Sequence, residues 1–214
     1  MNIADEAEHW PVASSAELVR SRLITVRVDK VRMPDNHLAE RDVVVHPGAV
    51  AVLTLDDADR VLMIRQYRHP VGHLLWEIPA GLRDVSGEAP WATAQRELAE
   101  EAGYRARDWR VLADYYSSPG YSTELLRIFL ARDPEPIPAA ERDFVPQDEE
   151  AFMLSGWLPL DEAVRKVFAG ELRDGPAALG IMAAYAARSQ GYDQLRAADA
   201  PEEQRRSPVE EGSL

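Results

Sequence analysis

The most constraining feature of this chain is a short acidic segment bracketed by signals that begin and end a helix. Pro90 suits the first turn of a helix and Gly103 suits the residue just past its end, which predicts a helix over about residues 90–102. At about 100° per residue, the apolar and the acidic side chains of this helix fall on different faces. The acidic face carries Glu97, Glu100 and Glu101.

So much negative charge on one helical turn calls for a cation. Like charges at the spacing of Glu97 and Glu101 destabilise an isolated helix by a few tenths of a kcal/mol, and the Arg96 to Glu100 spacing recovers only about as much. Carboxylate oxygens without histidine or cysteine favour Mg²⁺ or Mn²⁺ over Zn²⁺. The alternative interpretation is an ordinary solvated helix face, which is common among glutamate-rich helices.

The wider pattern around this helix resembles the signature of the Nudix hydrolases, enzymes that cleave nucleoside diphosphates linked to another group. The matching positions are Glu88, seven intervening residues, Arg96-Glu97, Leu98, Glu100-Glu101, Gly103 and Tyr104. Six residues, where the signature has five, separate Gly81 from Glu88, with Gly87 as the extra residue. An insertion in the loop before the helix leaves the helix acids in register.

Composition narrows the class of protein. The 214 residues are 46% hydrophobic, enough for one substantial core. A net charge of −13 argues against a broad nucleic-acid or anionic-membrane surface, so an anionic substrate must be met locally by metal and a few arginines. The absence of cysteine excludes disulfides and thiolate catalysis. No apolar run approaches the roughly 20 residues of a membrane span, and the N-terminus lacks signal-peptide character, so we expect a cytoplasmic protein.

Alternation along the chain predicts two hairpins and then a mixed arrangement. The stretch from about 17 to 46 predicts an N-terminal antiparallel hairpin, and residues 49–68 predict a second, more buried one. Later strands are expected near 109–116, 123–131 and 152–158, and helices near 160–169 and 175–189. Without a regular βαβ repeat, this order favours an α/β fold of the α+β type, a mixed sheet with helices on its faces.

The expected organisation has three parts. Residues 1–46 form a β-strand element, residues 47–190 form the main domain, and the charged, aperiodic residues 191–214 form a flexible tail. Two loops deserve attention. Residues 133–150 hold four prolines and end in three acids, which indicates either a functional loop or an exposed acidic linker. Residues 117–124 form a turn around Pro119-Gly120 that is, at its simplest, a hairpin loop.

Similarity to the ADP-ribose pyrophosphatase branch of the Nudix family, in particular the actinobacterial type, extends over about residues 20–190. It rests on Q-Y-R-H-P at 66–70, L-W-E-I-P-A-G at 75–81 and P-G-Y-S-T-E at 119–124. In this branch a proline follows the signature by about fifteen residues, the place that Pro119 holds. The resemblance implies a Nudix fold, an α/β/α sandwich around a mixed sheet, hydrolysis of ADP-ribose to AMP and ribose 5-phosphate, and a homodimer whose N-terminal strands cross to the partner.

The resemblance also implies roles for the metal site and the base. The Ala80 carbonyl with Glu97 and Glu101 holds Mg²⁺, with Glu100 as a further ligand or support, while Gly81 supplies the preceding turn. Arg96 orients the neighbouring glutamates. Water activation needs a carboxylate from elsewhere, and the acidic loop offers Glu150, with Glu149 as the alternative.

Substrate contacts are expected from several further residues. Arg68 suits phosphate because a guanidinium matches its oxygens, and Arg41 would reach the nucleotide from the partner's hairpin. Glu124 stands where family members contact the terminal ribose or its waters. Glu77 is either a buried partner or a binding group, and we count it among the substrate contacts.

Two other functions compete with ADP-ribose hydrolysis. The signature fixes the metal chemistry while loops fix the leaving group, so another nucleoside diphosphate sugar or a dinucleotide is the closest rival. A catalytically inactive ADP-ribose sensor is the second rival. The intact glutamates and the acidic loop speak against it.

Overall fold

The computed structural model describes residues 3–142 and 152–202. Within these ranges the chain forms two compact units. We call residues 3–47, 118–124 and 201–202 the small unit, and residues 48–117 and 125–200 the large unit. Across the described ranges, no helix combines the length and the apolarity that a bilayer crossing requires.

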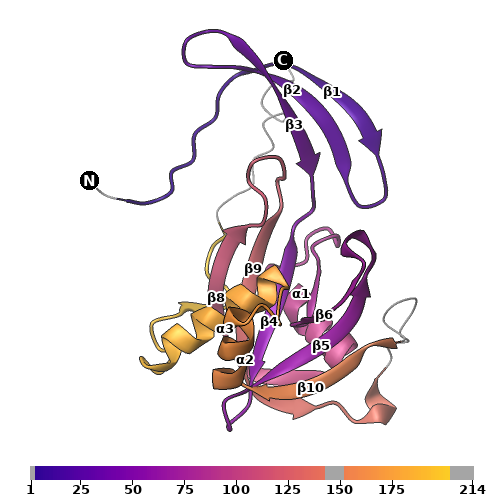
Figure 1. Cartoon of the computed structure of the whole chain (residues 1–214), viewed down its shortest axis with the longest axis vertical. Coiled ribbons are helices and arrows are strands. Elements are labelled where there is room, and N and C mark those ends of the chain that lie inside the picture. Colours follow the sequence, from indigo (N-terminus) through magenta and orange to yellow (C-terminus); the bar gives the residue numbers. More distant parts are fainter. Residues whose placement is uncertain (1–2, 143–151, 203–214) are drawn as a thin grey trace. The chain divides into compact units, whose positions relative to one another are not determined.

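The small unit is built on a three-stranded antiparallel sheet (Figure 1). Its strands are β1 (Val12–Arg20), β2 (Thr25–Arg32) and β3 (Leu38–Val45). The hairpin expected before residue 46 corresponds to β2 and β3, and β1 adds a third strand beside β2. Because β1 is exposed along nearly all of its length, its sequence lacks the alternation that marks a half-buried strand.

The predicted turn around Pro119 belongs to this small unit. The Tyr121 and Ser122 amides both donate to the Ser118 carbonyl, which closes the turn tightly. The turn is tied to the end of β3, where the Val44 N–H donates to the Tyr121 carbonyl (2.7 Å) and the Thr123 N–H donates to the Val44 carbonyl (3.0 Å). Residues 118–124 therefore pack with a strand some 75 residues earlier.

The large unit contains a mixed sheet. Its strands are β4 (Ala49–Leu55), β5 (Arg60–Arg68), β6 (His73–Glu77), β7 (Ala80–Leu82), β8 (Tyr104–Tyr116), β9 (Leu125–Pro136), β10 (Leu154–Pro159) and β11 (Arg196–Ala197). The main path runs β10-β5-β4-β9-β8-β11, with β6 paired to β5 and β7 paired to β4. The β4–β9 pair is parallel and the other pairs are antiparallel, as a mixed sheet requires.

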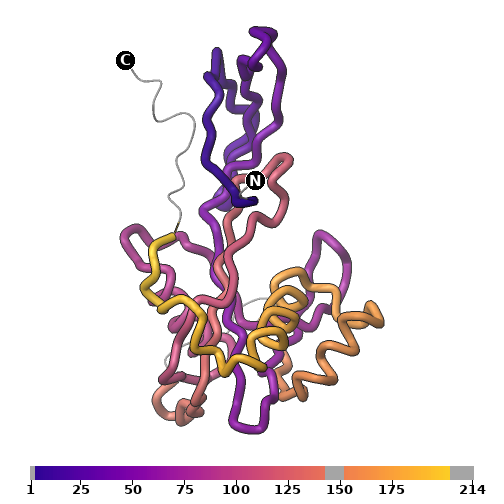
Figure 2. The backbone as a smooth tube through the Cα atoms, turned by 90° about the vertical axis from the view of Figure 1, so that its left-hand side faces the viewer, coloured from indigo at the N-terminus to yellow at the C-terminus, as the bar shows by residue number. Residues whose placement is uncertain are grey.

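Helices cover both faces of this sheet. The helices are α1 (Pro90–Glu97), α2 (Leu160–Phe168) and α3 (Gly175–Arg188). Along the completely buried β4, Ala51 and Leu53 pack with α2 and α3, while Val50 and Val52 pack with α1. Figure 2 shows the orange α2 and α3 together on one side of the strands. The α/β/α sandwich expected from the sequence is confirmed.

The first part of the expected flexible tail, residues 191–200, packs against the large unit, whereas residues 203–214 of that tail lie outside the described residues. Residues 196–197 form β11 against β8, and Tyr192 is buried in the core. Arg127 is a buried residue, 1% exposed, and its guanidinium donates to the Ala200 carbonyl (2.7 Å). Residues 191–200 are therefore packed against the sheet by contacts that their polar composition does not reveal.

Candidate active site

The acidic segment begins as a regular helix and ends in a wider turn. Pro90 lies in the first turn after an extended Ala89, and α1 continues into a π-helical turn, Leu98–Ala102, that stops at Gly103 in the left-handed region (φ 70°). Both predicted boundaries are thus confirmed. The regular spacing is not, because a π-turn inserts extra chain at the glutamates, a distortion that is frequent at functional sites.

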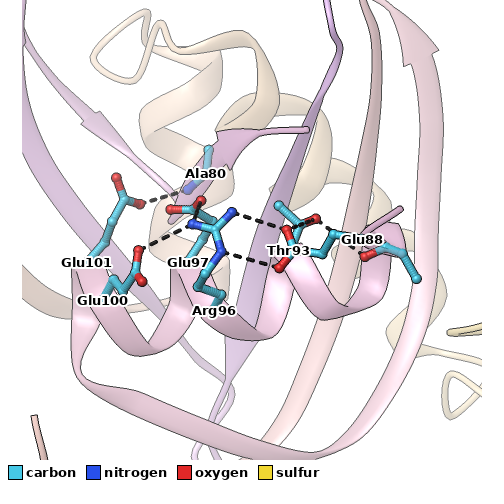
Figure 3. Close-up of polar contacts among 8 residues, drawn as sticks. Ala80, Glu88, Thr93, Arg96, Glu97, Glu100 and Glu101 are labelled. Carbon is cyan, nitrogen blue, oxygen red and sulfur yellow. Dashed lines mark hydrogen bonds and ion pairs between the residues drawn. The ribbon is translucent and has the colours of Figure 1, made fainter. Parts of the chain in front are cut away.

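Arg96 lies at the centre of the acidic cluster (Figure 3). Its Nη1 donates to Glu97 Oε1 (2.7 Å) and to Glu100 Oε2 (3.3 Å), and its Nε donates to Glu88 Oε1 (3.4 Å). The Thr93 hydroxyl donates to the other Glu88 oxygen (2.8 Å). One guanidinium therefore holds three carboxylates in fixed positions, and Glu88 is itself oriented by a second donor.

Glu101 points away from Arg96 towards the strand β7. The Ala80 N–H donates to Glu101 Oε2 (2.8 Å). Withdrawal of this carboxyl from water raises its pKa to about 8; the Ala80 N–H opposes the shift and the charge of Glu97 adds to it. A buried carboxyl that retains its proton near neutral pH, beside other acids, is stabilised in its charged form by a cation.

Gly81 allows β7 to approach the helix closely. A Cβ atom at this position would overlap the Cδ and Oε1 atoms of Glu97. Any side chain here would push the Glu97 carboxylate out of place. The glycine is therefore required by the packing of strand against carboxylate.

These residues fit a hard divalent cation. The available donors are carboxylate and main-chain oxygens, the set that Mg²⁺ and Mn²⁺ prefer. Within residues 3–142 and 152–202, no three acidic or histidine side chains converge into a ready-made metal site. In this structure Arg96 supplies the positive charge for Glu97 and Glu100, so a cation would take over part of that role.

A second charged group lies on the β5–β6 hairpin. Arg68 Nε donates to Glu77 Oε1 (2.8 Å), and Arg68 Nη2 donates to Glu77 Oε2 (2.5 Å). Gln66 Nε2 also donates to Glu77 Oε2 (3.4 Å). Glu77 is thus a buried partner of Arg68, one of the two roles that its position in the sequence left open.

Comparison with known proteins shows the family to which this chain belongs. The NUDIX domain matches residues 45–178. The chain belongs to the Nudix family. It is similar to the ADP-ribose pyrophosphatase of Mycobacterium tuberculosis, with 42% identity over 90% of this chain and 91% of that protein. It is also similar to the ADP-ribose pyrophosphatase of Bacillus subtilis, with 34% identity over 77% of this chain and 86% of that protein.

A solved structure shares the Nudix fold. The crystal structure of an ADP compounds hydrolase covers 88% of this chain and 99% of its own, with a TM-score of 0.67 and 23% sequence identity. The sandwich and the mixed sheet are therefore those of a known fold.

The site residues predicted for this Nudix chain are divided between the two units. The acidic cluster, Ala80, Gly81, Arg68 and Glu77 all belong to the large unit. Arg41, Glu124 and Pro119 belong to the small unit, where Arg41 Nη1 donates to the Glu40 carbonyl (2.8 Å) and a Glu124 carboxylate oxygen lies 3.5 Å from His46 Nδ1. Glu149 and Glu150 lie outside the described residues.

One charged residue near this Nudix site was missed by sequence reasoning. Asp174 caps α3 by accepting from the Ala177 N–H (2.8 Å). Burial raises the pKa of this carboxyl to about 6; the Ala177 N–H and Arg68 oppose the shift, and Glu77 adds to it. The sequence signal was present, since Asp174 precedes Gly175-Pro176 at the start of an apolar run, which is a helix-start pattern.

Proposed function

We propose that this Nudix protein hydrolyses the diphosphate linkage of ADP-ribose, giving AMP and ribose 5-phosphate, with Mg²⁺ as its preferred cation and Mn²⁺ as a substitute. The observation that carries the proposal is the acidic cluster beside Ala80 and Gly81, where the Glu97 carboxylate packs against Gly81 and Glu101 accepts from the Ala80 N–H (2.8 Å). Its substrate is supported by two relatives, at 42% and 34% identity, named ADP-ribose pyrophosphatases.

The reaction requires a diphosphate to be held beside a cluster of acids. Glu97, Glu101 and the Ala80 carbonyl would hold the cation, with Glu100 as a further ligand or support. When bound, the cation would neutralise charge on the diphosphate oxygens and make a nearby water more acidic. Arg96 holds Glu97 and Glu100 through its Nη1, so it orients two of the proposed ligands, and the cation would take over part of its charge.

Attack on phosphorus also needs a base and substrate contacts. We assign the base to Glu150, with Glu149 as the alternative, because the helix acids are committed to holding the cation. Arg68 binds a phosphate through its guanidinium. Arg41, from the partner chain, and Glu124 contact the nucleotide and the terminal ribose. We further propose a homodimer, as the resemblance to this Nudix branch implies, and a cytoplasmic location, as the character of the N-terminal sequence indicates.

A substrate panel tests the proposal. ADP-ribose, GDP-mannose, UDP-glucose, NADH and diadenosine polyphosphates would be compared at equal concentration with Mg²⁺, and products separated by chromatography. We expect AMP and ribose 5-phosphate from ADP-ribose at the highest kcat/KM. A preference above about tenfold for any rival would reassign the substrate.

Glu97→Gln separates an enzyme from a sensor. This variant should lose turnover across a Mg²⁺ titration because it weakens cation binding, whereas Glu162→Gln on α2 should retain wild-type rates.

Glu150→Gln should lower kcat by about 10²-fold or more with little change in KM, the effect of losing a general base. Wild-type protein that binds ADP-ribose with Mg²⁺ yet releases no AMP would instead be a sensor.

A further inference from the structure

The ion pair of the β5–β6 hairpin joins a buried carboxylate to a partly exposed guanidinium. Glu77 is only 2% exposed, whereas the Arg68 side chain is 43% exposed. Both Glu77 oxygens accept hydrogen bonds, from two nitrogens of Arg68 and from Gln66. A carboxylate that is buried and already has three donors is poorly placed to contact a substrate itself.

The bonded edge of Arg68 determines what its other edge can do. A guanidinium carries five N–H groups in one plane, and the Glu77 carboxylate uses those on the Nε and Nη2 side. The other edge is formed by Nη1 and the second N–H of Nη2. Among the described residues Nη1 meets no hydrogen-bond acceptor. This edge presents two parallel N–H groups, a spacing that matches two oxygens of one phosphate.

The hairpin holds this arrangement in place. Cross-strand pairs run from Ile64 with Glu77 to Arg68 with His73, so the ion pair spans the hairpin diagonally. Gln66 lies between the two charged residues on the same face of β5 and donates to the same carboxylate. The arginine is therefore oriented before any ligand binds, which lowers the entropy lost on binding.

The ion pair and the acidic cluster are joined through the chain, because Glu77 precedes Ala80 by three residues and the Ala80 N–H donates to Glu101 Oε2 (2.8 Å). Burial raises the pKa values of Glu101 and Asp174, and the positive charge of Arg68 works against both shifts. Arg68 thus acts electrostatically on Glu101, one of the residues to which we assign the cation. A diphosphate held by that cation would lie within reach of an arginine in this neighbourhood.

We propose that Glu77 is a positioning residue that does not touch the substrate but holds Arg68 so that its outer edge receives one phosphate of the diphosphate. This inference rests on the proposed function and deepens it. It replaces our expectation from sequence that Glu77 contacts the substrate directly. It also makes Arg68 and Glu77 one functional unit.

A double-mutant cycle tests this coupling. The four proteins are the wild type, Glu77→Gln, Arg68→Gln and the double variant, and the probe is inorganic pyrophosphate with Mg²⁺, whose dissociation constant is measured by calorimetry. Because charge-assisted hydrogen bonds are involved, each single change should weaken binding about tenfold or more. The double variant should bind no more weakly than Arg68→Gln, since Glu77 acts only through the arginine. If the two changes weaken pyrophosphate binding by factors that multiply in the double variant, the proposal is wrong. It is also wrong if Glu77→Gln binds pyrophosphate as tightly as the wild type.

Two further measurements exclude a purely structural effect. Thermal unfolding shows whether each variant is folded at the assay temperature, and KM should rise in Glu77→Gln by more than kcat falls. Asp161→Asn removes a comparable ion pair, with Arg188 (2.7 Å), on the exposed surface, and should change neither binding nor KM. If wild-type protein fails to hydrolyse ADP-ribose, the proposed function fails, but the pyrophosphate cycle still decides the role of Glu77.

Discussion

Gly81 is the residue at which the site is most sensitive to a single added atom. In Gly81→Ala the new methyl group would occupy the space of the Glu97 carboxylate, which must then move. We expect kcat/KM to fall about 10²-fold, because small displacements of positioned groups have effects of this size. Gly156→Ala on β10 is the matched control, since a Cβ there meets open space. A Gly81→Ala variant with normal kinetics would show that Glu97 need not stay where the structure has it.

Glu101 gives the protein a distinctive dependence on pH. Its pKa is raised from 4.5 to about 8, so the stability linked to its proton is complete below about pH 4.5 and is lost as the pH rises through 8. A cation requires the ionised carboxylate, so Mg²⁺ binding releases this proton and strengthens as the pH approaches 8. Mg²⁺ should therefore raise the melting temperature by more at pH 8.5 than at pH 6.5. Glu101→Gln should abolish this difference, and its persistence in that variant would place the titrating group elsewhere.

At the residue scale, the sequence predicts the groups that follow a fixed spacing and misses those that depend on distant contacts. Glu97, Glu100 and Glu101 lie in one short segment, so the sequence alone places them near one another, although the π-turn changes their relative directions. The proximity of Arg68 and Glu77 to that segment depends on how the β5–β6 hairpin pairs. Asp174 comes from the far end of the chain, and no local pattern connects it with Arg68.

At the scale of helices and strands, prediction from sequence has the same limit, as the acidic helix and the C-terminal segment show. Pro90 and Gly103 predict where the helix begins and ends, but nothing in the sequence predicts a π-turn at Leu98–Ala102. Residues 191–200 lack periodicity, and they are held by an ion pair from Arg196 to β8 and by a hydrogen bond from β9 to the Ala200 carbonyl. Arg127 and Arg196 both bind Asp114, from strands that are far apart in sequence.

Asp114 should therefore stabilise the large unit strongly. It accepts from Arg127 Nε (2.7 Å), Arg127 Nη2 (2.9 Å) and Arg196 Nη1 (2.8 Å). Asp114→Asn would leave a buried guanidinium poorly compensated, and we expect the free energy of unfolding to fall by about 3 kcal/mol in a denaturant titration. Asp108→Asn, whose partner Arg110 has a partly exposed side chain, should cost less than about 1 kcal/mol. Equal effects of the two changes would mean that burial of Arg127 does not govern stability.

For the whole molecule, the main finding is that the predicted site residues do not share one compact unit. The cation ligands and Arg68 belong to the large unit, whereas Arg41 and Glu124 belong to the small unit. The sequence predicts a separate N-terminal element, but residues 118–124 join it through hydrogen bonds to β3, and no local pattern indicates this. A site completed by the small unit of a partner chain, as proposed for the homodimer, is a property that only an assembly experiment can test.

Complementation between two inactive variants provides that experiment. Arg41→Ala and Glu97→Gln damage different units, and in a dimer with exchanged small units a mixed pair would contain one site with both residues intact. Random mixing makes half of the dimers mixed, so co-refolding equal amounts should restore about a quarter of wild-type ADP-ribose hydrolysis. Mixing Arg41→Ala with the Arg41→Ala/Glu97→Gln double variant is the control, because no intact site can form. If the first mixture shows only the summed activity of its parents while native mass spectrometry detects mixed dimers, each chain completes its own site and the shared-site model is wrong.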